Sequence, residues 1–109
     1  MTSESIYPPF LKWGDYKSKD EKNPDVLNVK VVETETFETQ YSINVRAEMD
    51  GTEMILPLHS FESKNNQLLQ LWTKAVKENK IKVGKKFKIK TWLGTSKNKF
   101  PIRRFELVF

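Results

Sequence analysis

Residues 82–93 read KVGKKFKIKTWL, and the strict alternation of side chains in this stretch decides the fold. A period of two predicts a strand with one buried and one exposed face. The face expected inside carries Phe87, Ile89, Thr91 and Leu93, and the other face carries Lys86, Lys88, Lys90 and Trp92. The loop GTSKNKF (94–100) and a second strand-like run, PIRRFELVF (101–109), follow, so the C-terminal part is predicted to be a β-hairpin.

This hairpin is also the most basic part of the chain. Residues 82–109 contain nine basic and one acidic residue, a net charge of +8, whereas residues 1–81 contain ten basic and thirteen acidic residues, a net charge of −3. Such local asymmetry favours an anionic partner. The alternative is a solvated, lysine-rich surface without a partner.

Composition limits the class of protein. With 109 residues, 38% of them hydrophobic, the chain is expected to form one globular domain, at 25–109, preceded by a tail and packing segment at 1–24. The absence of cysteine excludes disulfides and thiolate metal sites and favours a soluble protein of the cytoplasm or nucleus. A single histidine, His59, makes no metal cluster, and we expect neither a metal nor a cofactor.

The middle of the chain predicts three further strands and one helix. Alternating residues at 26–36 and 41–49 indicate two strands around a turn at 33–40, and Asp50-Gly51 predicts a tight hairpin into a returning strand at 53–58. Residues 63–80 change to a helical period, with Trp72 on the apolar side and therefore expected in the core.

Three strands, a helix and two strands is the order of the OB-fold, a five-stranded Greek-key barrel with its helix between the third and fourth strands. The predicted fold is therefore mainly β, with this architecture. The alternative is an open α+β sheet with the helix covering one face.

In layout, the chain from about 26 to 109 resembles small OB modules that bind single-stranded DNA, of the single-strand-binding and replication-protein-A type. The likeness lies in the turn entering Thr39-Gln40-Tyr41, the Asp50-Gly51 hairpin, and the glycine that precedes the basic strand in residues 81–89. The resemblance implies a ligand that crosses strands two and three, between the loops joining strands one to two and four to five. The basic loop 94–100 fits, whereas the acidic loop around 33–38 departs from the pattern.

Alternate lysines on one strand face would stand about 7 Å apart, close to the spacing of phosphates. Trp92, next to them, is expected to be exposed and to stack a base. The alternative role of such lysines is to protect an edge strand from aggregation. The complete set of predicted contacts is Lys86, Lys88, Lys90, Trp92, Lys97, Lys99, Phe100, Arg103 and Arg104, with Asn44 and Arg46 as secondary contacts on the second strand.

Catalysis is not expected, because the sequence has no phosphate-cradling glycine loop and no cysteine nucleophile. The sequence therefore predicts a non-catalytic protein that binds single-stranded DNA with little sequence preference. Two alternatives stay open: an RNA-binding OB module, and a protein-interaction subunit of a replication or repair assembly. Trp13 and Tyr16 could either plug the barrel or stack on a ligand.

Overall fold

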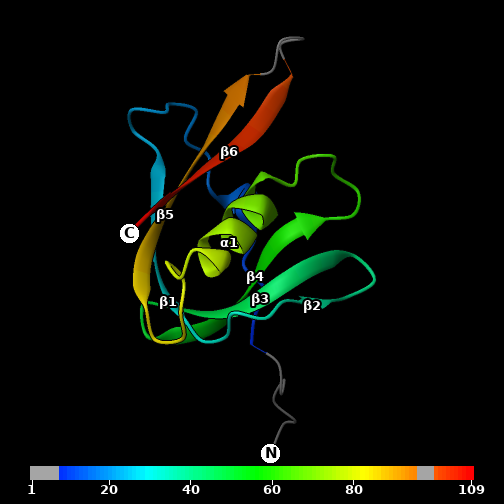
Figure 1. Cartoon of the computed structure of the whole chain (residues 1–109). Helices are drawn as coiled ribbons and strands as arrows, with labels where there is room; N and C mark the ends of the chain where they lie inside the picture. Colours follow the sequence, from blue (N-terminus) through cyan, green and yellow to red (C-terminus); the bar gives the residue numbers. More distant parts are fainter. Residues whose placement is uncertain (1–7, 96–99) are drawn as a thin grey trace, which may run out of the picture.

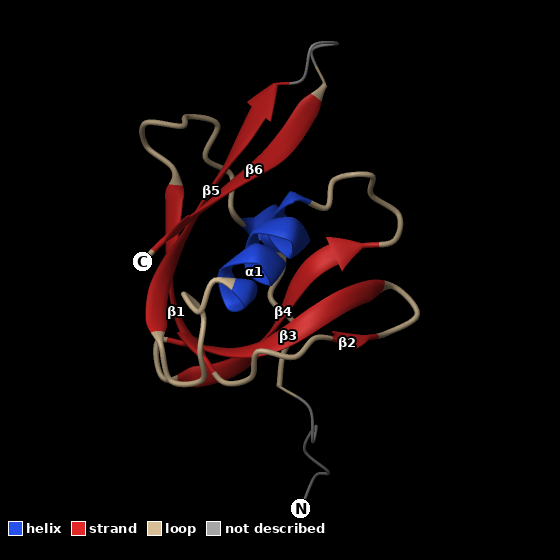
Figure 2. Ribbon diagram, viewed as in Figure 1, coloured by secondary structure: helices blue, strands red, loops and turns tan. Residues whose placement is uncertain are grey.

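The structure, a computed structural model, describes residues 8–95 and 100–109 and consists mainly of β-strands (Figures 1 and 2). One sheet of six antiparallel strands is accompanied by one α-helix. In chain order the elements are a 3₁₀ turn Trp13–Asp15, β1 Asp25–Val31, β2 Phe37–Glu38, β3 Ser42–Met49, β4 Thr52–Ser60, α1 Gln67–Lys77, β5 Lys86–Thr95 and β6 Pro101–Val108.

The five longer strands and the helix lie where the sequence predicts them, in the predicted order. The sixth strand, β2, has only two residues and pairs with the start of β3, in a segment expected to be a turn. The predicted number of five strands is therefore one too low. With only two residues, β2 is too short to show a hydrophobic period in the sequence.

Strand pairing runs β4–β3–β1–β5–β6 across the sheet, with β2 beside the beginning of β3. The β3–β4 hairpin turns at Asp50 and Gly51, whose φ angles are +53° and +81°. Positive φ at both central residues is the geometry that an Asp-Gly pair favours in a tight hairpin, so this prediction is confirmed.

The core lies between the curled sheet and α1, which contacts β4 and β6 (Figure 1). Trp72 is the largest fully buried side chain, with 1% exposure, and its indole Nε1 donates a hydrogen bond to the Thr34 carbonyl oxygen at 3.2 Å. The predicted core position of this residue is confirmed. The core is completed by apolar residues of every long strand: Leu27, Val29, Val31, Val45, Ala47, Leu56, Leu58, Phe87, Ile89 and Phe105.

Between β4 and β6, side-chain amides take the place of a strand pairing. No pairing joins β4 to β6 among the residues that the structure describes. Instead the Asn65 amide donates to the Arg103 carbonyl oxygen at 2.8 Å, and the Phe105 N–H donates to Gln67 Oε1 at 2.9 Å. The Arg103 carbonyl and the Phe105 N–H, at the open edge of β6, therefore have hydrogen-bond partners although no strand lies beside them.

Residues 9–18, which we call the strap, cross the same gap. Leu11 and Pro9 bond to Ile55 on the free edge of β4, and the Leu93 N–H of β5 donates to the Ser18 carbonyl oxygen at 2.8 Å. Between these ends, Trp13 donates to the Pro57 carbonyl oxygen at 2.8 Å and packs edge-on against Phe105, with ring centroids 4.9 Å apart. Trp13 and Tyr16 are half-buried and pack against the core, so they act as plugs in this structure.

Candidate functional site

The alternation predicted for β5 is present in the structure. Phe87, Ile89 and Thr91 are buried, with exposures of 4% or less, while Lys86 and Lys88 are exposed and Lys90 is half-buried on the opposite side. We call the side of β1, β5 and β6 that faces away from the core the outer face. It carries the cationic residues Lys30, Lys86, Lys88, Lys90 and Arg104, together with Val26, Asn28, Trp92, Val108 and one acid, Glu106, which stands opposite Lys90.

Lys30 of β1 stands directly opposite Lys86 of β5 in the antiparallel ladder. Like charges facing each other across two strands destabilise a sheet. Within residues 8–95 and 100–109, the ion pairs are Arg46 with Glu33 and Glu53, and Lys80 with Glu78, so none includes an outer-face lysine. Two acids do stand opposite these lysines in the ladders, Glu48 of β3 opposite Lys30 and Glu106 of β6 opposite Lys90. Lys30 is not among the contacts predicted from the sequence, because its place beside Lys86 follows only from the pairing of β1 with β5.

Trp92 and Arg104 are paired residues of β5 and β6 at the loop end of the outer face. Trp92 is half-buried, so the prediction of an exposed ring is only partly met. A Cβ at Gly94 would lie 3.2 Å from Cγ of Arg104, so the glycine leaves room for the arginine side chain beside the tryptophan. A groove of about 460 Å³ lies beside Trp92, Gly94 and Arg104, and Glu21 and Glu106 also line it.

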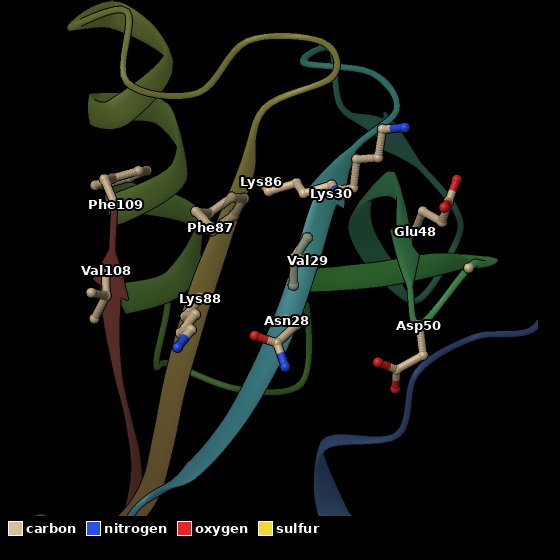
Figure 3. Close-up of a pocket in the computed structure, with 11 residues that line it drawn as sticks. Asn28, Val29, Lys30, Glu48, Asp50, Lys86, Phe87, Lys88, Val108 and Phe109 are labelled. Carbon is tan, nitrogen blue, oxygen red and sulfur yellow. The ribbon is translucent and has the colours of Figure 1, made fainter.

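A larger groove, of about 670 Å³, occupies the other end of the outer face (Figure 3). Its middle is formed by β1 and β5, one wall by the end of β6, and the opposite wall by the β3–β4 turn. The residues that line it are Asn28, Val29, Lys30, Glu48, Asp50, Gly51, Lys86, Phe87, Lys88, Val108 and Phe109.

Asn44 was expected to point outward from the second strand, and this prediction is wrong. The residue is 0% exposed, and its amide group bonds to Ser42, accepting from the hydroxyl at 2.8 Å and donating to the carbonyl at 3.2 Å. The register of β3 against β4 shifts between Ile43 and Asn44. The extra residue of this bulge is Leu58 of β4, so the alternation of β3 itself is unbroken. Asn44 also pairs with Phe37 of β2, a strand that the sequence did not predict, so it lies between two strands and not at an open edge.

Arg46 is half-exposed, but two carboxylates already bind it. Its guanidinium lies 2.6 Å from Glu53 and 3.7 Å from Glu33. The hydrogen bond to Glu53, then the negative charges of Glu53 and Glu33, raise the pKa of Arg46. Because its charge is matched, this arginine is a poor phosphate contact, contrary to the expectation for strand two.

Arg103 lies on the core side of β6, whereas Arg104 lies on the outer face. Its guanidinium donates to the Tyr16 carbonyl oxygen at 2.7 Å and to the Thr91 hydroxyl at 3.1 Å, and burial lowers its pKa. Consecutive residues of a strand point to opposite faces, so both arginines could not join one patch. The role predicted for Arg103 is therefore corrected to a structural one, tying the strap to β5 and β6.

The loop between β5 and β6 is described only in part. Phe100 is 67% exposed, next to the start of β6, while Lys97 and Lys99 lie outside the described residues. His59 is half-buried on β4, with its Nδ1 3.3 Å from the Asn65 carbonyl oxygen and its ring edge-on to Phe61. In the described ranges no three His, Asp or Glu side chains gather around a possible metal position, and no helix has the length and apolar character to cross a membrane.

Comparison with models of protein families, with curated proteins and with solved structures finds no match to this chain.

Proposed function

We propose that this protein is a non-catalytic single-stranded DNA-binding protein, and that the strand lies on the outer face of β5 and its neighbours. The observation that carries the proposal is the row of lysines on that face. Lys86, Lys88 and Lys90 alternate along β5, and Lys30 joins them from β1 without an ion pair to any described residue. Like-charged side chains held side by side favour a polyanion that neutralises them.

The spacing of these charges supports an extended strand as the ligand. Alternate residues of a β-strand lie about 7 Å apart, close to the distance between successive phosphates of an extended single strand. Arg104 extends the row past Lys90 to the loop end of β6. Phosphates on these side chains would leave the bases free to turn toward aromatic rings.

Trp92 supports a single strand rather than a duplex. The bases of a single strand can stack on an aromatic ring, whereas those of a duplex are already stacked on each other. The groove that Trp92 and Arg104 both line leaves space for such a base. Stacking of this kind contributes about 1–3 kcal/mol per base and has little sequence preference.

The proposed fold is a variant of the OB-fold barrel. Support comes from the pairings of β1 with β3, β3 with β4, β1 with β5 and β5 with β6, and from the helix between β4 and β5. In this proposal the strap, Asn65 and Gln67 replace the pairing that would close the barrel between β4 and β6.

The test is a fluorescence-anisotropy titration with a labelled dT oligonucleotide of roughly 16 nucleotides, the upper end of the site size of one OB-fold. The expected result is binding near micromolar or tighter. The logarithm of the binding constant should fall with the logarithm of salt by about 0.7 per phosphate contact, so five cations give a slope of about −3.5.

Unlabelled competitors added to the same titration show which class of ligand the protein prefers. The proposal expects unlabelled single-stranded DNA to displace the probe at lower concentration than duplex DNA, RNA of the same length or a poly-glutamate peptide. No binding at low salt contradicts the proposal, and stronger competition by RNA or by the acidic peptide redirects it to those ligands.

A further inference from the structure

We propose that the groove between the β3–β4 turn and Phe109 holds one nucleotide of the bound strand. Its phosphate would lie on Lys30, Lys86 and Lys88, and its base against Val108 and Phe109. The strand would then run along β5 and end at β1, instead of crossing β3 and β4 as the resemblance to OB modules implies. This inference rests on the proposed function and names the path of the ligand.

The dimensions of the groove suit one nucleotide. Its volume of about 670 Å³ falls within the range of about 300–1,000 Å³ that is usual for small-molecule sites. Figure 3 shows the lysines and Asn28 on the two central strands, with Val108 and Phe109 on one side and Glu48 and Asp50 on the other. A cationic centre beside an apolar wall matches the two halves of a nucleotide.

The two residues of the apolar wall come from different sides of the sheet: Val108 lies on the outer face opposite Lys88, whereas Phe109 packs on the core side of β5. Phe109 is 49% exposed, and its ring stacks on buried Phe87 with centroids 5.4 Å apart and planes at 26°. Lys80 of the connection after α1 lies 5.9 Å from the centre of the same ring and is itself paired with Glu78 at 3.5 Å. A base packed on the exposed part of Phe109 would bury apolar area that now faces water.

The acidic wall of the groove limits how far the bound DNA extends across the sheet. Glu48 of β3 is the ladder partner of Lys30 on one side and of Glu53 on the other, and Asp50 follows in the turn. Beyond them Arg46, the cation of that part of β3, is already bound to Glu33 and Glu53. Phosphates are therefore attracted as far as β1 and repelled beyond it.

The outer face also fixes the length of strand required. Lys86 and Trp92 are six residues apart on β5, which is about 20 Å along a strand. A ligand that reaches from the groove to Trp92 therefore needs roughly 4 nucleotides or more, the lower end of the site size of an OB-fold. One end of this ligand should contact Phe109 and the other end Trp92.

A photocrosslinking experiment tests this path. An oligo-dT of roughly 8 nucleotides carries 5-iodouracil at its first or its last position and is irradiated with the full chain. We expect one of the two probes to crosslink to the peptide that contains Phe109, and the other to the peptide that contains Trp92. Phe109→Leu, which keeps an apolar side chain, should remove the first crosslink and leave the second.

A pair of charge variants supplies a second readout. Glu48→Gln removes one acid from the groove, and Glu38→Gln removes the same charge from β2, at the opposite end of β3. At low salt we expect Glu48→Gln to raise the affinity for the oligonucleotide roughly threefold, and Glu38→Gln to change it less. The opposite order would mean that the strand crosses β3 near β2.

The outcomes separate this inference from the proposed function. Binding with crosslinks confined to Trp92, or located on β3 and β4, overturns the nucleotide groove and leaves single-strand binding intact. Absence of binding to any oligonucleotide overturns both. Unchanged thermal unfolding of the variants excludes loss of fold as the cause of a lost crosslink.

Discussion

Trp92 is the residue whose removal separates stacking from charge. Replacing Trp92 by alanine is expected to weaken oligonucleotide binding about tenfold, because the stacked base loses its partner. The salt dependence should stay the same, since no phosphate contact is lost. Anisotropy titrations at several salt concentrations measure both quantities.

The matched control is Trp92→Phe, which retains a ring at the same place. It should keep more of the affinity than the alanine variant does. If the two variants bind equally well, or as well as the unaltered protein, Trp92 does not stack on the ligand. Thermal unfolding of both variants tests whether the half-buried indole also supports the fold.

Replacing Lys86 by glutamine is expected to have opposite effects on stability and on oligonucleotide binding. Because it faces Lys30 across the ladder, Lys86→Gln should leave the free energy of unfolding unchanged or raise it by about 0.2–1 kcal/mol. The same change should weaken oligonucleotide binding and reduce the salt slope by about 0.7. Chemical denaturation and the salt titration measure the two effects.

Lys77→Gln is the control for Lys86→Gln, because it removes one exposed lysine from the last turn of α1. It should change affinity much less and leave the salt slope unaltered. A destabilised Lys86→Gln variant with normal binding would mean that this lysine serves the fold alone.

At the level of single residues, period-two patterns predicted the lysine face of β5 but not every neighbour. The register places Lys86, Lys88 and Arg104 as the alternation indicates. Asn44 was misplaced because β2, which pairs with it through Phe37, is too short to leave a pattern in the sequence. The alternation of β6 already places Arg103 and Arg104 on opposite faces, and the partners that show Arg103 to be the inner one, Tyr16 and Thr91, are distant in sequence.

At the level of elements, the strap is expected to stabilise the gap between β4 and β6. Trp13→Phe keeps a ring against Phe105 and removes the hydrogen bond to Pro57, so it should cost about 1 kcal/mol. Trp13→Ala removes the ring contact as well and should cost more. Chemical denaturation measures both, and two variants as stable as the unaltered protein would contradict a stabilising role of the strap.

Tyr16 in the strap gives a prediction for alkaline pH. Burial, and then the negative charges of Asp15, Asp25 and Asp50, raise the pKa of its phenol above 10.0. The folded state therefore holds this proton more tightly than the unfolded chain does. The stabilisation is complete below pH 10.0 and is lost as the pH rises from there through the pKa of the folded state.

The measurement for Tyr16 compares thermal unfolding of the protein and of Tyr16→Phe at neutral pH and at about pH 10.5. The difference in stability between the two should shift in favour of the phenylalanine variant at the higher pH. A difference that stays constant would mean that the phenol ionises alike in the folded and unfolded states.

Hydrophobic period was sufficient to predict the five long strands and α1, because each buries one face. It could not reveal β2, which has two residues, or the strap, whose contacts lie on distant strands. Nor could it show that Asn65 and Gln67 provide hydrogen bonds to β6, which does not pair with β4 among the described residues. These features depend on tertiary contacts, not on local pattern.

Over the whole molecule, folding separates the charges that the sequence distributes unevenly. The lysines of β1 and β5 and Arg104 occupy the outer face, while Glu33 and Glu53 bind Arg46 of β3, and Glu48 faces Glu53 across β3 and β4. The molecule thus presents a cationic surface beside an acidic one, with the groove of Figure 3 at the boundary. A polyanion should therefore be attracted to the cationic outer face and repelled by the acidic surface beside it.

The most direct test is an NMR titration of the ¹⁵N-labelled protein with oligo-dT of roughly 8 nucleotides. The account predicts that the largest shifts occur in the amides of Lys30, Lys86 and Lys88 and in the indole N–H of Trp92, while Arg46 and Glu53 change little. Shifts centred on β3 and β4, with the outer face unchanged, would contradict the assignment of the outer face as the binding surface.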